Sequence, residues 1–391
     1  MIFNNQNIDY SKKTKRELYE NLFLFYVISN KHLVFIGKII LNLALYMKLP
    51  IKVLIKNTVF KYFCGGESIK ESEKVITLLG EHNIKSILDF SIEGKQEQKS
   101  FENTYNEIIN NLNYAHANNL VPFSVFKISG LARINFLQKI NHKVYLEEFE
   151  STLSQKDLRE YREIKNRLWN IAHKAKECKI PILIDAEESW IQNSIDFLTE
   201  KLMCEFNNDS VIIFNTVQLY RKDKLMYIKK LHKNSVIKKY RLGLKLVRGA
   251  YIEKEYHHAI KKKHKSPIHN TKEECDQDFN EACLYCLKHI NTISICVGTH
   301  NEESTAIVTK KMLDYNIKRN DERIYFAQLL GMSDNISFTL SKNGYNTAKY
   351  VPYGPVKEVI PYLIRRAEEN SSISGQTNKE ILRIKEAIMN Y

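Results

Sequence analysis

The sequence predicts an α/β protein whose eight parallel strands close into a (β/α)8 barrel of the TIM type. From residue 86 onward, short runs rich in β-branched and aromatic residues alternate with helical stretches. Parallel strands need long crossover connections, and eight strand–helix units close such a barrel. A doubly wound sheet is the alternative, but no G-x-G-x-x-G follows the first run, which favours the barrel. The eight runs are SILDFS (86–91), PFSVFKIS (122–129), PILIDAE (181–187), SVIIFNTVQLY (210–220), GLKLVRGAY (243–251), SICVGTHN (294–301), IYFAQLLGM (324–332) and AKYVPYG (348–354).

The length of 391 residues predicts one large barrel with an extension, or two domains, because a chain this long exceeds one small core. We expect an N-terminal helical arm at 1–82 and a catalytic barrel at 83–391. Hydrophobic residues make up 43% and charged residues 27%, which is typical of a globular protein. Seven cysteines, an odd number without regular spacing, indicate reduced thiols. Charged insertions at 141–160 and 254–275 are expected to form long helices or loops.

The arm carries an apolar and basic run at 17–60, which predicts two or three helices, the last opened by Pro50, and a further helix follows at 68–82. The longest window free of charge, between Lys38 and Lys48, has nine residues, which is too short to span a bilayer. These helices either pack on the barrel or contact anionic lipid through their lysines. The lysines concerned are Lys31, Lys38, Lys48, Lys52 and Lys56.

The formal charge of +14, from 59 basic and 45 acidic residues, indicates an anionic partner. The lysines are spread widely, and no RNP, zinc-finger or recognition-helix signature accompanies them, so we expect no nucleic acid. The first residues are polar and show no signal peptide. No His, Asp and Glu set has the spacing of a metal site, and no G-x-S-x-G nucleophile elbow occurs. An anionic cofactor or substrate is therefore favoured.

Polar side chains end seven of the eight predicted strands, where the active sites of barrel enzymes lie. Each alone has a structural explanation, such as an aspartate that caps the next helix. Together they predict a site at the barrel mouth, with GTHN opening the sixth helix as a pyrophosphate cradle. These residues are Lys127, Asp185, Glu187, Gln218, Lys245, Arg248, Tyr251, Thr299, His300, Asn301, Gln328 and Tyr350.

The stretch KYVPYGPVKEVIPYLIRRAEEN (349–370) predicts a short strand followed by a helix that opens at Pro355. Its tandem Arg365 and Arg366, with Glu369 nearby, form either a solvated helix end or a forked donor set for a planar anion. Ten residues into a helix is roughly 15 Å along its axis. For these arginines to reach a substrate, the helix must lie across the barrel mouth.

Seven motifs in this order, together with FCGGES at 63–68, resemble the proline dehydrogenase family over roughly residues 60–375. The motifs are LIDAEES, NTVQLYR, KLVRGAY, GTHN, QLLGMSD, YVPYGP and LIRRAEEN. The resemblance implies a distorted barrel that binds FAD, with its eighth helix over the mouth. It further implies hydride transfer from L-proline to flavin N5, Δ1-pyrroline-5-carboxylate as product, and a membrane quinone as the electron acceptor.

The resemblance also implies a location for this chain, and two other functions compete with the one that it implies. We expect a single-function enzyme that is cytoplasmic or peripheral on the inner membrane, on the matrix side in a eukaryotic cell. A non-catalytic basic scaffold and a barrel acting on phosphorylated sugars are the alternatives. The latter would need a phosphate loop after the seventh and eighth strands, and QLLGMSD and YVPYGP offer few spare glycines for one.

By the same resemblance, residues at the mouth take up catalytic, substrate and cofactor roles. Asp185, Lys245 and Tyr251 are expected to be catalytic, with Lys245 donating toward the flavin. The substrate residues would be Lys127, Arg365 and Arg366 on the carboxylate, Leu329 and Tyr350 on the ring, and Glu67, paired with the arginines on closure. FAD would contact Ala186, Gln218, Arg248, Gly249, Ala250, Thr299, His300, Asn301 and Glu369.

The sequence departs from the family in its fifth-strand motif. Relatives often carry arginine at the first basic position and lysine at the second, whereas this chain has Lys245 and Arg248. A single ammonium at 245 keeps the charge but lacks the forked geometry of a guanidinium. Tyr350 is also large, so we expect it to leave little room for a ring hydroxyl and to favour proline over hydroxyproline.

Overall fold

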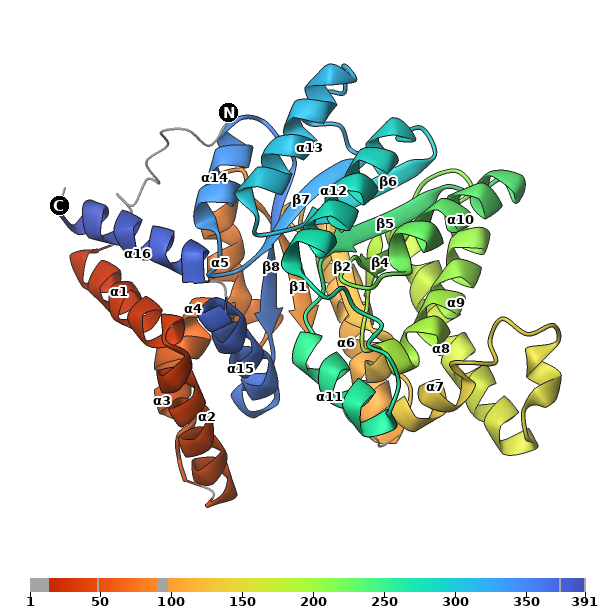
Figure 1. Ribbon diagram of the computed structural model, residues 1–391, viewed down its shortest axis with the longest axis horizontal. Helices are drawn as coiled ribbons and strands as arrows, with labels where there is room; N and C mark the ends of the chain where they lie inside the picture. The colour runs from red at the N-terminus through yellow and green to blue at the C-terminus, as the bar shows by residue number, and fades with distance from the viewer. Residues whose placement is uncertain (1–13, 48, 91–97, 373, 390–391) are drawn as a thin grey trace.

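The computed structural model describes residues 14–47, 49–90, 98–372 and 374–389 (Figure 1). Eight parallel strands pair in sequence order, and the first pairs with the last to close a barrel. The predicted barrel is therefore confirmed, and the doubly wound alternative is excluded. Ser91, the last residue of the first predicted run, lies outside the described residues. The strands are β1 (Lys85–Phe90), β2 (Phe123–Lys127), β3 (Ile182–Asp185), β4 (Ile213–Gln218), β5 (Leu242–Val247), β6 (Ile293–Gly298), β7 (Ile324–Leu329) and β8 (Thr347–Tyr353).

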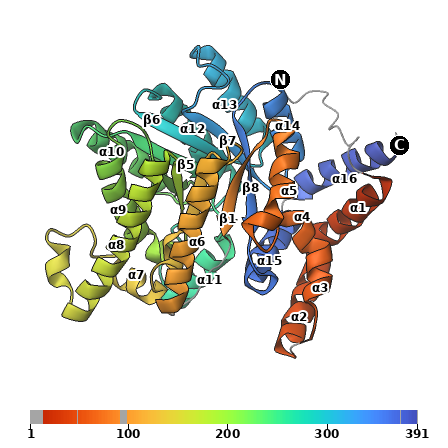
Figure 2. The same ribbon diagram turned by 180° about the vertical axis from the view of Figure 1, so that it is seen from behind.

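Helices surround the barrel on the outside, as both views show (Figures 1 and 2). The main crossover helices are α6 (Gln98–Ala117), α8 (Gln155–Cys178), α9 (Ser189–Phe206), α10 (Lys224–Ile237), α12 (Lys272–Lys288), α13 (Glu302–Asp314) and α14 (Asp334–Lys342). Shorter elements extend the connections at the carboxyl ends of the strands. They are η2 (Ile128–Gly130), α7 (Ile134–Ile140), η3 (Phe149–Thr152) and α11 (Ile252–Lys262), of which η3 and α11 lie in the two predicted insertions.

The barrel interior is a small apolar cluster contributed by seven of the strands. Successive side chains of a strand point to opposite faces, so every second residue enters the barrel. The interior set includes Val125, Leu183 and Ala327. The next inward positions along these strands are Lys127, Asp185 and Leu329, which places two charged side chains directly above the apolar layer. The cluster as a whole is Ile87, Phe123, Val125, Leu183, Phe214, Cys296, Ala327, Ala348 and Tyr350.

The N-terminal arm packs on the C-terminal helices and forms a second core with them. Leu18, Phe25 and Ile28 of the first helix share a buried cluster with residues of α15 (Val356–Ser372) and α16 (Ser374–Met389). The first and last described helices, α1 and α16, therefore lie together on one side of the barrel (Figures 1 and 2). Because α15 belongs to this core, the arm and the barrel share buried side chains. The expected domain boundary at residue 82 stays a prediction. The arm consists of α1 (Lys15–Ser29), α2 (Lys31–Tyr46), α3 (Lys52–Ile55), the π-helical η1 (Lys56–Phe60), α4 (Lys61–Phe63) and α5 (Ile69–Gly80).

None of the described helices is by itself long and apolar enough to cross a membrane. The consecutive helices Lys15–Ser29 and Lys31–Leu41 reach such a length together, but they are bent by 93° where they meet.

The eighth barrel helix, α15, lies beyond the arrowhead of β8 rather than along the outside of that strand (Figure 1). Its apolar face, with Val359, Tyr362 and Leu363, packs on Phe60 and Phe63 of the arm. The arm thus holds α15 at the carboxyl end of the barrel. This is the placement that the position of Arg365 and Arg366 in the helix demands.

Candidate active site

Three predicted residues meet inside the barrel, where β3, β5 and β8 supply one side chain each. The Lys245 ammonium donates hydrogen bonds to Asp185 Oδ1 and to Tyr350 Oη, the latter at 2.6 Å. The same ammonium lies 4.6 Å from the centre of the Tyr350 ring. Burial raises the pKa of the Tyr350 phenol well above its usual value, so the hydroxyl stays protonated. A buried cation is thereby held in one position by a carboxylate, a hydroxyl and an aromatic face.

The strand register sets further predicted residues beside this cluster. Lys127 and Asp185 are direct neighbours at the ends of β2 and β3, and Leu329 is the direct neighbour of Tyr350 between β7 and β8. Tyr251 is buried directly before α11 and lies 5.1 Å, from ring centre to Nζ, from Lys254. The mouth therefore combines cationic, acidic and apolar side chains around one point, as a small zwitterionic ligand requires.

Arg248 lies at the end of β5 with all three guanidinium nitrogens engaged. Nε donates to Asp276 Oδ1 at 2.6 Å, Nη1 to Thr299 Oγ1 at 2.7 Å, and Nη2 to Ser304 Oγ at 2.8 Å. The guanidinium carbon also lies 4.4 Å from the centre of the Phe279 ring. A lysine could not make this set of contacts, because its ammonium lacks the planar fork. The arginine at this position thus has its own set of partners, of which Thr299 is itself a predicted cofactor residue.

The predicted cradle at the start of α13 surrounds His300 with positive charge. Burial, and after it the charges of Lys349, Arg366 and Arg248, lower the pKa of His300 to about 3. Its Nδ1 lies 3.1 Å from Ser333 Oγ. A neutral imidazole among three cations marks a region of positive potential that suits an anion.

Asn301, which was predicted to bind the cofactor, uses its side chain to cap α13. Its Oδ1 accepts a hydrogen bond of 3.0 Å from the Ser304 amide, and its own amide donates to Thr299 Oγ1 at 3.1 Å. A cap of this kind satisfies amides that the first turn of a helix leaves unpaired. The side chain therefore has a structural role, and contact with a cofactor stays a prediction.

Arg366 is buried, with 6% of its surface exposed, which excludes a solvated helix end. Its Nη2 donates to Glu369 Oε1 at 2.7 Å, and its guanidinium carbon lies 5.0 Å from the centre of the Tyr362 ring. Burial raises the pKa of Glu369, while the neighbouring arginines oppose that rise. The Arg366 Nε is buried and has no hydrogen-bond partner among the residues that the structure describes. Such a donor is costly unless a ligand satisfies it.

Glu67 joins the arm to the start of α15. It forms ion pairs with Lys56 at 2.8 Å and Lys52 at 2.9 Å, and it accepts a hydrogen bond of 3.4 Å from the Val356 amide. The Lys56 ammonium lowers the pKa of Glu67 to about 2. The expected pairing of Glu67 with Arg365 and Arg366 stays a prediction.

The other predicted cofactor residues line the ends of β3, β4 and β5. Gln218 Nε2 donates to the Glu187 carbonyl at 2.7 Å, which links β4 to the segment that follows β3. Gly249 has a φ of +130°, and a Cβ atom there would lie 2.6 Å from the Tyr220 ring, so only glycine fits. Ala186 is buried and Ala250 is exposed.

No role was predicted from the sequence for Lys349, a buried residue of β8 whose hydrogen bonds stabilise the mouth. Lys349 donates to Asp334 Oδ1 at 2.8 Å and to the Met332 carbonyl at 2.5 Å, and so braces the turn after β7. This turn contains Ser333, at a φ of +52°. A charged residue inside the buried run AKYVPYG was the signal that could have identified it, because a buried charge needs a partner.

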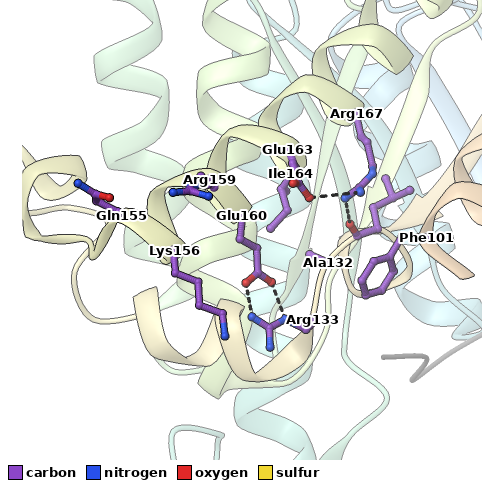
Figure 3. A pocket seen from close by; sticks show the side chains of 11 residues that line it. Phe101, Ala132, Arg133, Gln155, Lys156, Arg159, Glu160, Glu163, Ile164 and Arg167 are labelled. Carbon is purple, nitrogen blue, oxygen red and sulfur yellow. Dashed lines mark hydrogen bonds and ion pairs between the residues drawn. The ribbon is translucent and has the colours of Figure 1, made fainter. Parts of the chain in front are cut away.

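A cavity of about 730 Å³ lies outside the mouth, against the first turns of α8 (Figure 3). Arg133 Nε donates to Glu160 Oε1 at 2.8 Å, and Arg167 Nη1 donates to the Leu131 carbonyl at 3.1 Å. Most of the charged side chains that line the cavity therefore have partners among the other lining residues. The cavity shares with the mouth only the segment that follows β2.

Fold and site together define a barrel of the kind that enzymes use, with charges at its mouth that suit a small anionic or zwitterionic ligand. The family model described as proline dehydrogenase matches residues 72–379. Mitochondrial proline dehydrogenase 1 of Dictyostelium discoideum is 32% identical over an alignment of 432 residues, which covers 98% of this chain and 75% of the relative. The carbapenem antibiotics biosynthesis protein CarD of Pectobacterium carotovorum is 30% identical over 321 residues, covering 82% of this chain and 80% of that protein. The chain therefore belongs to the proline dehydrogenase family, whose members are oxidoreductases that act on proline.

Solved structures support the fold independently. The proline utilization A protein of Bdellovibrio bacteriovorus superposes with a TM-score of 0.72 at 20% identity. The match covers 91% of this chain and 37% of that protein, so this chain spans about a third of its length.

Proposed function

We propose that this chain oxidises L-proline to Δ1-pyrroline-5-carboxylate, with FAD as the immediate acceptor and a membrane quinone as the final one. The observation that carries the proposal is Arg366, a buried guanidinium with one unsatisfied donor at the carboxyl ends of the strands. Its place at the mouth is supported by its electrostatic effect on His300 at the end of β6. The mitochondrial relatives favour the matrix side of the inner membrane as the location in a eukaryotic cell.

The residues present fit FAD. Arg248, Arg366 and Lys349 create positive potential around His300, which suits a pyrophosphate, and Thr299 and His300 precede the first turn of α13. The other residues that would hold FAD are Gln218, Gly249 and Ala250, with Ala186, Asn301 and Glu369 nearby in the sequence motifs. When bound, FAD supplies the acceptor for the electron pair of the substrate C–H bond.

The chain's own residues bind and orient the substrate. Arg365, Arg366 and Lys127 hold the proline carboxylate, because forked guanidiniums match a planar anion. Leu329 and Tyr350, neighbours across β7 and β8, pack on the pyrrolidine ring.

Inside the barrel, the Lys245 ammonium pairs with Asp185. The ammonium stabilises negative charge that develops next to it when the substrate is oxidised. Tyr251 closes the pocket beside α11.

The visible absorption spectrum of the purified protein tests this function. We expect flavin absorbance that bleaches when proline is added without oxygen. A folded protein that is colourless, or a flavin that proline does not bleach, would overturn the proposal. The non-catalytic scaffold predicts a colourless protein that binds polyanions in a salt-sensitive manner.

Tyr350 is expected to select proline over hydroxyproline. The Lys245 ammonium holds the Tyr350 ring in place, and the ring is buried in the barrel. The Tyr350 ring therefore cannot move aside to make room for a hydroxyl group on the ring of the substrate. Tyr350→Ser should lower kcat/KM for proline and raise the hydroxyproline-to-proline ratio by roughly tenfold, as expected for a contact of one to two kcal/mol. Steady-state kinetics with both substrates measure this ratio. Tyr350→Phe is the matched control, because it keeps the ring and removes only the hydroxyl; a wild-type enzyme that prefers hydroxyproline would refute the prediction.

The arm supports the quinone part of the proposal through an exposed apolar surface on α2. Tyr46 is 86% exposed and Ile40 is 61% exposed, and most described large apolar side chains of this helix face solvent. An exposed apolar helix that also carries lysines fits the surface of an anionic bilayer. Lys38 of this helix pairs with Glu368 of α15, so α2 is tied to the mouth helix. Lys48, one of the predicted lipid lysines, lies outside the described residues.

Vesicle binding tests the membrane contact. Ile40→Asp should weaken co-sedimentation with vesicles that contain anionic lipid by about tenfold or more, because a charge replaces an inserted apolar side chain. Ile260→Asp, at a position that is 76% exposed on α11, is the matched control and should bind as wild type does. Equal binding of both variants, or a stable dimer buried through α2 in solution, would contradict the lipid contact.

A further inference from the structure

The buried carboxylate of Glu187 lies at the mouth, and the proposed reaction does not use it. Only 5% of its surface is exposed, and it comes two residues after Asp185. Its backbone is fixed on two sides, because the amide donates to Gln192 Oε1 and the carbonyl accepts from Gln218 Nε2, both at 2.7 Å. The side chain is therefore presented from a rigid support.

The side chain reaches across to the turn that follows Lys127. Its Oε1 accepts a hydrogen bond of 3.0 Å from the Ser129 amide, and its Oε2 is paired with the Ser129 hydroxyl. Ser129 is buried in η2, which begins one residue after Lys127. Glu187 thus holds both polar groups of Ser129 and fixes the chain where Lys127 leaves β2.

Glu187 also interacts electrostatically with the Lys127 ammonium. Its neighbour Glu188 also interacts with it, and Glu188 is paired with Lys254 of α11 at 2.6 Å. The groups that face it from α9 and β4, Gln192 and Gln218, are neutral. Lys127 is therefore the cation whose charge Glu187 affects directly.

We propose that Glu187 is a positioning residue that fixes Lys127 for the substrate and, through its own protonation, sets how strongly Lys127 attracts the substrate carboxylate. The proposal rests on the proposed function in one respect, namely that Lys127 binds the carboxylate. An ionised Glu187 attracts the ammonium and repels an incoming anion. A protonated Glu187 does neither.

The direction of the pH dependence follows from these charges. Burial raises the pKa of Glu187 to about 7, while the two hydrogen bonds from Ser129 oppose that rise. The group is therefore protonated below pH 7 and ionised above it. Affinity for a carboxylate should fall as the pH rises through this range, and by linkage the ligand should bind together with a proton near pH 7.

Binding of tetrahydrofuran-2-carboxylate to the flavin-loaded enzyme tests the proposal. This probe has an ether oxygen in place of the amine, so it neither titrates in this range nor undergoes oxidation. For the wild type, we expect Kd to rise roughly five- to tenfold between pH 6 and pH 8.5, as for an ordinary coupling between sites. Glu187→Gln should bind with a Kd that does not change over this range. A flat wild-type profile, or a slope that survives in Glu187→Gln, would overturn the proposal.

Two further variants separate positioning from a general loosening of the turn. Glu160→Gln makes the same chemical change outside the mouth, where Glu160 forms an ion pair with Arg133. This variant should keep the wild-type dependence of Kd on pH. Ser129→Ala removes a hydrogen bond that favours the ionised form, so the inflection should move to higher pH, which a purely structural role would not cause. If Glu187→Gln fails to fold, binding heats of the wild type in two buffers at pH 7 still decide: absence of proton uptake contradicts the proposal. An enzyme that binds the probe at no pH would contradict the proposed function as well.

Discussion

Arg366→Met is expected to lower kcat/KM for proline by about a hundred- to a thousandfold, which is the usual cost of removing one partner of a buried, charge-assisted pair. Arg366 is buried against Tyr362 and Glu369, and its Nε points to no partner among the described residues. A proline carboxylate would satisfy that donor. The loss should appear mainly in KM, because the carboxylate is bound in the ground state as well as in the transition state.

Two further variants define the cause of this loss. Arg366→Lys keeps the charge without the fork and should fall between wild type and Arg366→Met. Lys357→Met removes an exposed cation from the same helix, and it should leave kcat/KM within about twofold of wild type, since surface charges contribute little. If Lys357→Met and Arg366→Met lower kcat/KM equally, the effect is one of net charge, and the assignment of Arg366 is wrong.

Lys245→Met is expected to slow flavin reduction by about a hundred- to a thousandfold, the typical cost of removing one preorganised donor from an active site. It also leaves the half-buried Asp185 without its cation, which should destabilise the fold by roughly 3–5 kcal/mol. Stopped-flow absorbance measures the reduction rate, and denaturant unfolding measures the stability.

The double variant Lys245→Met, Asp185→Asn separates these two effects. It removes the uncompensated carboxylate, so stability should recover while the reduction rate stays low. The chain offers a matched control in Lys224, which is buried and pairs with Asp196 at 2.5 Å between α10 and α9. Lys224→Met should destabilise to a similar extent, but the folded fraction should reduce flavin at the wild-type rate. Recovery of the rate in the double variant would show that Lys245 is only structural.

The strands were predictable because each is a buried run that differs in composition from the helices around it. β7 and β8 begin within one residue of their predicted starts, at Ile324 and Thr347. The side chains at the mouth were predictable for a related reason. Lys127, Asp185 and Lys245 stand in otherwise apolar strands, where an isolated charge requires a partner.

Pairings between distant segments were not predictable, because a residue's partner depends on how strands and helices are placed in space. Asp276 holds Arg248 from a helix that follows β5, and its sequence context shows only a polar helix start. Glu67 was expected near the arginines, and the structure gives it Lys52 and Lys56 as partners. The hydrogen bond from the Ser129 amide to Glu187 joins the ends of two strands, and these two residues are 58 positions apart in the sequence.

By itself, the sequence determined the barrel and the family and indicated which side chains gather at the mouth, because apolar periodicity and ordered motifs are local properties of the chain. The tertiary structure decided which of those side chains form ion pairs and hydrogen bonds with one another. Closure of the barrel brings Asp185 and Lys245, 60 residues apart, into contact with Tyr350. Packing of α15 on the arm removes Arg366 from solvent, and this burial is what suits a guanidinium in a helix to the anion-binding role that we propose for it.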